Sequence, residues 1–446
     1  MQLTLITLPV LILILPLTTA LGVFLPPRYT APVLTLGGLA FGLAAGGFPS
    51  LLLMLCAAVA GWMFLHVQPP AQQKNAMPYL TAGYAVQFLI LMLGRWLLSD
   101  AICILPLLLC AVQNAGFQYE RAHYRTDIPG LSRYLCLCCA LPRLLTGPIL
   151  TAEQAQTIRG TRKNTAQRTI RGAMLLTAGL FESILLALPV LSLHQEILAQ
   201  RAIVTAADAW CAMTVSVCGL LCTLTGLRDI GRGTSLLLGF EPDGFISTPA
   251  RTESLAGYFR RRIPALSAWV KRLFLRDGLP FDHAAYAARM MLLLGTAGVL
   301  VFNSLNGLFF GTLLALMLTA ERMLAQRGLH PPKRIAPFAV WLLLLIASAV
   351  LQGDSLTTSF SCLGSLLGIN GFLPGGAMKY LLTTHWLPLL TALFILLPLR
   401  RAGRYLVTRF LRRSRAAAYA ALVVLPLTEL TLLLLCLAEL MSRYAR

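Results

Sequence analysis

The residues best placed to do chemistry in this sequence are polar side chains that lie inside long apolar stretches. The set comprises Asn114, Glu182, Asp229, Arg232, Asn303 and Asn306. A polar or ionisable group at membrane depth is costly to bury and usually faces a cavity or a partner, so each is a candidate for a site. The alternative is structural: Asp229 pairs with Arg228 or Arg232, and the asparagines bridge neighbouring helices.

A cluster of three cysteines, Cys136, Cys138 and Cys139, first suggests a metal or lipidation site. Its spacing does not match the C-x-x-C pattern of zinc sites, and no second pair or nearby histidine completes a ligand set. We therefore predict a structural role, with S-acylation as the alternative. Other cysteines, such as Cys56 and Cys218, lie in apolar stretches and behave as small hydrophobic residues.

The elements that position these residues follow from composition. The 446 residues are 57% hydrophobic and 12% charged, whereas a soluble domain carries roughly 25% charged residues. Windows of about 20 apolar residues, enough to cross a bilayer core, recur along the chain. Because backbone groups in lipid must be hydrogen-bonded internally, these windows predict helices. The sequence therefore predicts an all-α polytopic membrane protein with roughly 10–11 transmembrane helices.

The expected spans fall into an early, a middle and a late group. They lie near residues 3–25, 32–46, 51–66, 79–98, 101–116, 172–193, 204–227, 287–301, 305–324, 336–351, 381–399 and 417–441. No separate soluble domain or internal repeat stands out between them. We therefore expect one membrane-embedded domain over residues 1–446.

The net charge of +20 concentrates between the spans. Basic segments lie near residues 119–171, 241–282, 322–335 and 400–415. Nucleic-acid binding is the alternative for a basic chain, but these segments flank apolar helices and carry no recognition module. The positive-inside rule predicts that they are cytoplasmic and contact anionic lipids. Arginines beside aromatic residues near 258–273 also predict a helix at the membrane interface.

Several short blocks, in order along residues 1–370, resemble motifs of one family. Residues 141–149 read Leu-Pro-Arg-Leu-Leu-Thr-Gly-Pro-Ile, close to a Phe-Pro-Gln-Leu-x-x-Gly-Pro-Ile signature. Residues 223–229 read Thr-Leu-Thr-Gly-Leu-Arg-Asp, similar to Asp-Phe-Ser-Gly-Tyr-Ser-Asp. Smaller matches are Pro26-Pro27-Arg28-Tyr29, Tyr124-Arg125, Phe259-Arg260-Arg261, Leu266-Ser267-Ala268-Trp269, Glu321-Arg322 and Asp354-Ser355. The chain thus resembles the membrane-bound O-acyltransferase (MBOAT) family, in particular its bacterial branch related to alginate O-acetyltransferase.

The resemblance implies a ring of membrane helices around a central funnel, with interfacial or re-entrant helices. It also implies transfer of an acyl group to a hydroxyl of an extracytoplasmic polysaccharide, with a histidine as general base. An alcohol is a weak nucleophile at neutral pH and needs such a base. The chamber-lining candidates are then Asn114, Asp229, Ser247, Arg260 and Arg261.

The sequence departs from the family pattern at the reaction chamber. Asn303 or Asn306 occupies the position of the family's key histidine, and neither can take up a proton. Ile263 stands at a second frequent histidine position, and Thr223 and Ser247 replace an aspartate and an asparagine. The chamber has therefore lost its usual groups.

The six histidines of the chain offer one plausible replacement. His66, His123, His194, His283 and His330 fall at span ends or in loops, where a solvated or interfacial histidine is expected. His385, beside Trp386, begins a late span and is the plausible substitute.

Three functions remain open. The loss of both histidines favours a degenerate MBOAT-like protein that serves as scaffold, conduit or non-catalytic subunit in an envelope-polysaccharide acylation or assembly system. The alternative is an active O-acyltransferase with a non-standard site, which would use acyl-CoA or an acyl-carrier protein as donor. A transporter or lipid-handling protein is the second alternative, although no inverted repeat is evident. All three predict an integral protein, which the resemblance places in the bacterial inner membrane. The resemblance also implies polysaccharide-synthesis or acylation proteins as possible partners. We expect no bound metal, cofactor or nucleic acid.

Overall fold

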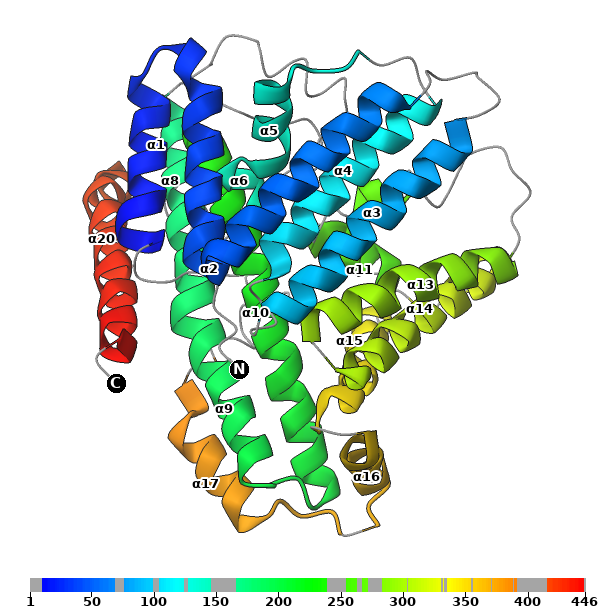
Figure 1. The fold of residues 1–446 in the computed structure, drawn as a ribbon. Coiled ribbons are helices and arrows are strands. Elements are labelled where there is room, and N and C mark those ends of the chain that lie inside the picture. Colours follow the sequence, from blue (N-terminus) through cyan, green and yellow to red (C-terminus); the bar gives the residue numbers. More distant parts are fainter. Residues whose placement is uncertain are drawn as a thin grey trace. The chain divides into compact units, whose positions relative to one another are not determined.

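Every secondary-structure element in the described part of the chain is helical, which confirms an all-α polytopic architecture (Figure 1). The computed structural model describes residues 10–68, 76–98, 104–123, 127–145, 166–238, 254–262, 267–271, 283–302, 304–329, 332, 335–353, 356–369, 371–387, 389–390 and 415–444.

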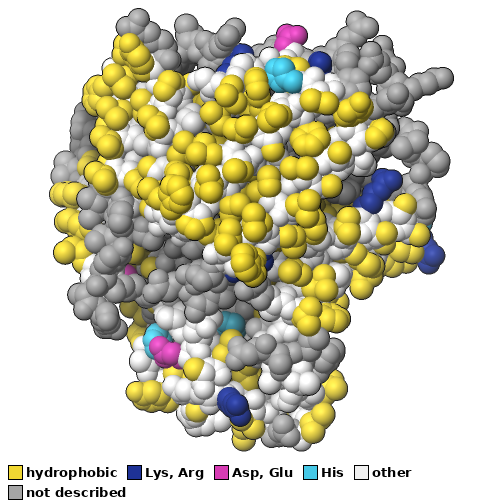
Figure 2. Space-filling view, in the orientation of Figure 1, with side chains coloured by type: hydrophobic (Ala, Val, Ile, Leu, Met, Phe, Trp, Pro, Cys, Tyr) yellow, Lys and Arg dark blue, Asp and Glu magenta, His cyan; other side chains and the backbone are white. Residues whose placement is uncertain are grey.

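Six helical segments among the described residues are long and apolar enough to cross a membrane. They are Tyr29–Val67, Pro78–Leu97, Gln167–Ala199, Ala206–Leu237, His283–Phe302 and Leu305–Gln326. Large apolar side chains on their outer faces are exposed, as lipid-facing side chains must be. Figure 2 shows hydrophobic side chains spread over helices α1 to α4 with few charged groups among them. The chain is therefore an integral membrane protein by length and composition of its helices.

The chain divides into two compact units. The first contains residues 1–173 and 231–347. Its helices are α1 (Leu15–Phe24), α2 (Pro27–Val67), α3 (Ala76–Leu97), α4 (Leu105–His123), α5 (Leu131–Cys139), α6 (Leu141–Leu144), α11 (Leu255–Arg262), α13 (His283–Phe302), α14 (Leu305–Gln326), most of α15 (Ala336–Ser348) and the ends of α8 and α10. A π-helical turn, η1 (Val10–Ile14), precedes α1.

Helix α2 runs through the centre of the first unit and is interrupted once. Gly46 and Gly47 leave the helical conformation, and Gly47 has φ of 67°, which a residue with a side chain adopts only with strain. This break falls between the two spans predicted near residues 32–46 and 51–66. Helices α3, α4 and α5 all pack against α2 (Figure 1).

The second unit contains residues 174–230 and 348–446. It holds residues 174–180 of α8 (Ala166–Leu180), most of α10 (Ala206–Leu237), the π-helical η3 (Phe181–Ala187), α9 (Leu188–Ala199), η4 (Ala349–Leu351), α16 (Leu356–Leu366), α17 (Gly376–Thr384) and α20 (Arg415–Tyr444). Pro189 has no N–H to donate back into the preceding turn, which explains the widened helix just before α9. Most of the span predicted near 381–399 lies outside the described residues.

Candidate functional site

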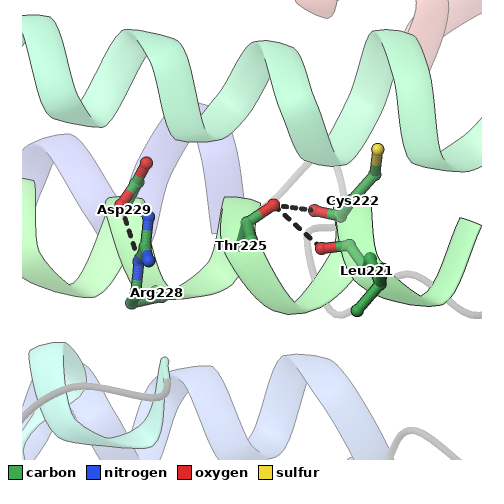
Figure 3. Close-up of polar contacts among 5 residues, drawn as sticks. All are labelled: Leu221, Cys222, Thr225, Arg228 and Asp229. Atoms are coloured by element: carbon green, nitrogen blue, oxygen red, sulfur yellow. Dashed lines mark hydrogen bonds and ion pairs between the residues drawn. The ribbon is translucent and has the colours of Figure 1, made fainter. Parts of the chain in front are cut away.

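The block at residues 223–229 forms one continuous stretch of α10 (Figure 3). The Thr223 hydroxyl donates to the Gly219 carbonyl at 2.9 Å, and the Thr225 hydroxyl donates to the Leu221 carbonyl at 2.8 Å. Both hydroxyls are therefore satisfied by the backbone of their own helix, a common way to bury threonine in a membrane helix.

The charge of Asp229 is neutralised by its neighbour in sequence. The Arg228 guanidinium contacts Asp229 Oδ1 through Nη2 at 2.7 Å and through Nε at 2.9 Å. Both side chains are largely buried, and Figure 3 shows them turned toward each other. The predicted pairing of Asp229 with Arg228 is confirmed.

Gly226, in the same block, permits a close helix contact. A Cβ atom added at Gly226 would overlap the Ser183 hydroxyl and approach the Gly179 carbonyl oxygen to 2.8 Å. Small residues let membrane helices approach this closely. The glycine of the family-like motif therefore serves packing between α10 and the preceding helical segment.

Asn306 lies in the first turn of α14, and its side chain is buried. Ser304 is the N-cap residue, and its hydroxyl accepts a hydrogen bond from the Gly307 N–H at 3.1 Å. Asn303 and Ser247 lie outside the described residues. At the one described position that matches the family histidine, the chain therefore carries a buried amide.

At the opposite end of α14, Glu321 holds the start of α11. Its carboxylate oxygens accept from the backbone N–H groups of Leu255 at 2.6 Å and Ala256 at 2.9 Å. A carboxylate suits a helix N-terminus because it satisfies free N–H groups and the positive end of the helix dipole. Arg260 is exposed and Arg261 is half-buried near the other end of α11.

Asn306 and the helix that carries Arg260 and Arg261 are therefore attached to opposite ends of α14. Fifteen residues separate Asn306 from Glu321, about 22 Å along a helix. Among the described histidines of this unit, His66 and His123 hydrogen-bond carbonyl groups of their own helices. His283 is the first residue of α13 and lies about 30 Å along that helix from its last residue, Phe302, which precedes α14.

Asn114 lies at the meeting point of four helices. Its Nδ2 donates to the α2 carbonyl of Ala57 at 2.9 Å and to Gln87 Oε1 of α3 at 3.3 Å. Its Oδ1 accepts from the Tyr134 hydroxyl at 2.8 Å and from the Cys138 thiol at 2.9 Å, both on α5. The amide is fully buried, and both its nitrogen and its oxygen are hydrogen-bonded. This matches the expectation that asparagines bridge neighbouring helices.

The cysteine cluster is part of the same packed region. Cys138 and Cys139 are buried, and Cys136 is nearly so. Burial raises the pKa of the Cys136 thiol, which disfavours the reactive thiolate. These contacts support the predicted structural role and leave the thiols of Cys138 and Cys139 inaccessible to acylation. No group of three or more His, Cys, Asp or Glu side chains in the described part of the chain could hold a metal ion.

His194 is the residue that sequence reasoning placed wrongly. It was expected to be solvated or interfacial, but it lies within α9 and is buried. Gln352 Nε2 donates to the Ser348 carbonyl at 3.1 Å, so Gln352 Oε1 faces His194 Nε2 at 3.0 Å and accepts a hydrogen bond from its N–H. This fixes the imidazole as the Nε2–H tautomer. The apolar run around residues 186–198 was the signal that the span extends past His194.

His385, the predicted substitute for the family's histidine, is the C-cap residue of α17 and is only partly buried. Its Nδ1 hydrogen-bonds the Leu381 carbonyl at 3.3 Å. Asp229, His194 and His385 belong to the second unit, and Asn114, Asn306, Arg260 and Arg261 belong to the first.

A scan against protein-family models and a search of curated proteins find no match to this chain. The MBOAT resemblance therefore stays a prediction that rests on the short blocks quoted above.

Proposed function

We propose that this chain is an MBOAT-like inner-membrane protein of a bacterial envelope-polysaccharide acylation or assembly system. Its role there is that of a scaffold, conduit or non-catalytic subunit. Its partners are the proteins that synthesise or acylate the polysaccharide, and its basic loops contact anionic lipids. The observation that carries the proposal is the buried amide of Asn306, at one of the two positions that match the family's general base.

Further support comes from contacts between motif blocks that lie far apart in the sequence. Glu321, of the Glu-Arg match, binds the start of the helix that ends in the Phe-Arg-Arg match. Trp269, of the Leu-Ser-Ala-Trp match, lies against Gly116, where an added Cβ would come within 3.0 Å of its indole nitrogen. Within the first unit, the Glu-Arg block therefore contacts the helix that carries the Phe-Arg-Arg block, and Trp269 packs on α4.

The proposal predicts that Asn306→Ala leaves biological function intact. Deleting the gene should lower the O-acyl content of the extracted envelope polysaccharide, measured by mass spectrometry. The wild-type chain and Asn306→Ala should restore it equally, because an amide that accepts no proton performs no base catalysis. Immunoblots of membranes control for protein level.

Two other outcomes of this experiment count against the proposal. A polysaccharide that is unchanged by the deletion would remove the assignment to an acylation system. Loss of complementation by Asn306→Ala, at a normal protein level, would instead assign Asn306 a role in the reaction.

One observation favours a second candidate, an O-acyltransferase with a non-standard base. With Nε2 of His194 protonated and held by Gln352, the Nδ1 lone pair is the free acceptor of the ring. In this mechanism Nδ1 takes the proton of the acceptor hydroxyl as its oxygen attacks the thioester carbonyl. The C–S bond then breaks, and the leaving thiolate recovers that proton from the imidazolium, so the products are an ester and a free thiol.

This candidate predicts a large effect at His194. With purified full-length protein in nanodiscs, labelled acetyl-CoA and polysaccharide, His194→Gln should reduce acyl transfer by about 10²–10⁴-fold. Gln352→Leu should reduce it less and shift the pH profile, because it frees the ring to change tautomer. His385→Gln, at the partly exposed end of α17, is the matched control and should transfer normally. Absence of transfer by the wild-type protein would eliminate this candidate and leave the non-catalytic role standing.

A further inference from the structure

The segment between α16 and α17 is apolar although neither helix can span a bilayer. Residues 355–378 contain no charged side chain. Helix α16 has 11 residues and α17 has 9, so they reach about 16 Å and 14 Å. A bilayer core is about 30 Å thick. The stretch is therefore uncharged, like a membrane segment, but it is divided into two helices that are each too short to cross the bilayer core.

The turn that joins the two helices, residues 367–375, carries four of the most exposed large apolar side chains in the described chain. The exposed fractions are 79% for Leu367, 73% for Ile369, 73% for Phe372 and 82% for Leu373. Contiguous exposed apolar groups of this kind mark an interaction surface. We call residues 367–375 the apolar turn.

Backbone hydrogen bonds fix the apolar turn to the start of α10. The Ala206 N–H donates to the Gly371 carbonyl at 3.0 Å, and the Gly375 N–H donates to Asp208 Oδ1 at 3.0 Å. The other oxygen of Asp208 accepts from the Thr205 N–H at 3.0 Å. One buried carboxylate thus caps α10 and also holds the N-cap residue of α17. These bonds therefore hold the turn in the conformation that exposes its apolar side chains.

These bonds set the level of the apolar turn relative to the membrane. The span Gln167–Ala199 ends, and the span Ala206–Leu237 begins, on either side of the loop to which the turn is attached. Helix α17 lies beside the end of α9 (Figure 1). Tyr380 and Trp386, which follow the turn, are also exposed, and these residue types favour the membrane interface. The surface is therefore continuous with the lipid-facing surface of two spans.

The side of the membrane follows from the charges on the same segment. Arg168 and Arg171 lie at the start of Gln167–Ala199, and the apolar turn lies at its other end. The positive-inside rule makes the start cytoplasmic. The turn then belongs to the extracytoplasmic leaflet.

We propose that the apolar turn inserts into the extracytoplasmic leaflet of the bilayer as a re-entrant anchor, with Leu367, Ile369, Phe372 and Leu373 among the acyl chains. Tyr380 and Trp386 lie at the level of the headgroups. The occupant of this surface is lipid, because its level, composition and continuity with the spans all match the hydrocarbon boundary.

A spin label at Leu373 tests the position of the turn. Leu373→Cys is made in a background in which Cys56, Cys103 and Cys211 are replaced by Ala, since most described cysteines are buried. The labelled full-length protein is placed in phosphatidylcholine nanodiscs, and power saturation measures collisions with oxygen and with a water-soluble nickel complex. Leu292→Cys, exposed in the middle of α13, is the lipid reference, and Leu329→Cys, exposed just after α14 in the basic segment near residues 322–335, is the water reference.

The label at Leu373 should show the high oxygen and low nickel accessibility of the label at Leu292. Nickel accessibility equal to that at Leu329 would place the turn in water and overturn the proposal. Low accessibility to both reagents would show a protein partner or second copy over the turn, which also overturns it. Phe372→Cys provides a second site if Leu373→Cys does not fold.

Discussion

Replacing Asn114 by leucine is expected to lower the free energy of unfolding by about 3–5 kcal/mol, because each buried polar group left without a partner costs about 1–3 kcal/mol. Leucine has the same number and branching of side-chain heavy atoms as asparagine, so the change removes hydrogen bonds without leaving a cavity. The Tyr134 hydroxyl and the Cys138 thiol lose their acceptor, and the Ala57 carbonyl loses one of its donors. Thermal unfolding of the detergent-solubilised protein, followed by size-exclusion chromatography, measures the loss.

Tyr134→Phe is the matched partial variant, because it removes one donor to Asn114 and leaves the amide in place. It should cost about 1 kcal/mol, as expected for one hydrogen bond. In the double variant the two losses should not add, since the Tyr134 hydroxyl has no acceptor left to lose once Asn114 is gone. A wild-type melting temperature for Asn114→Leu would show that the amide does not join the helices.

The fold could be predicted where composition decides it. Long apolar windows predicted helices at α2, α3, α10, α13 and α14, because backbone groups in lipid leave no other choice. The position of the Gly46–Gly47 break also followed from the sequence, since a polar and small-residue gap separated two windows. The apolar turn could not be predicted, because its composition matches a span and only tertiary hydrogen bonds to Asp208 and Ala206 limit its helices.

The candidate site was predictable in part. Pairing of Asp229 with Arg228 followed from adjacency and from the cost of an isolated charge in lipid. The burial of His194 did not follow, because its partner Gln352 lies 158 residues away in the sequence. No local pattern reports a contact of that range. The same limit applies to Glu321, whose cap on α11 joins residues 66 apart.

Gly298→Ala in α13 is expected to be strongly destabilising although alanine is the better helix former. In an exposed helix the exchange stabilises by about 0.5–1 kcal/mol. Here α13 and α14 pack so closely that an added Cβ at Gly298 would overlap the carbonyl group of Gly307, and one at Gly311 would overlap that of Leu294. Backbone atoms cannot move aside as a side chain can, so the helices must separate. Overpacking of this kind typically costs about 1–3 kcal/mol, and we expect the upper end for Gly298→Ala and Gly311→Ala.

Gly295→Ala, one turn earlier on α13, is the control that separates close packing from helix propensity. A Cβ at Gly295 would come close to two side-chain atoms, Leu308 Cδ1 at 3.1 Å and Thr312 Cγ2 at 3.2 Å, and would lie at an ordinary contact distance of 3.9 Å from the Leu308 carbonyl oxygen. The two side chains can rotate, so the variant should unfold within a few degrees of the wild-type protein in the same thermal assay. Equal melting temperatures for Gly295→Ala and Gly298→Ala would contradict backbone contact between α13 and α14. Because Asn306 lies in the first turn of α14, beside Gly307, separation of this hairpin should also displace its buried side chain.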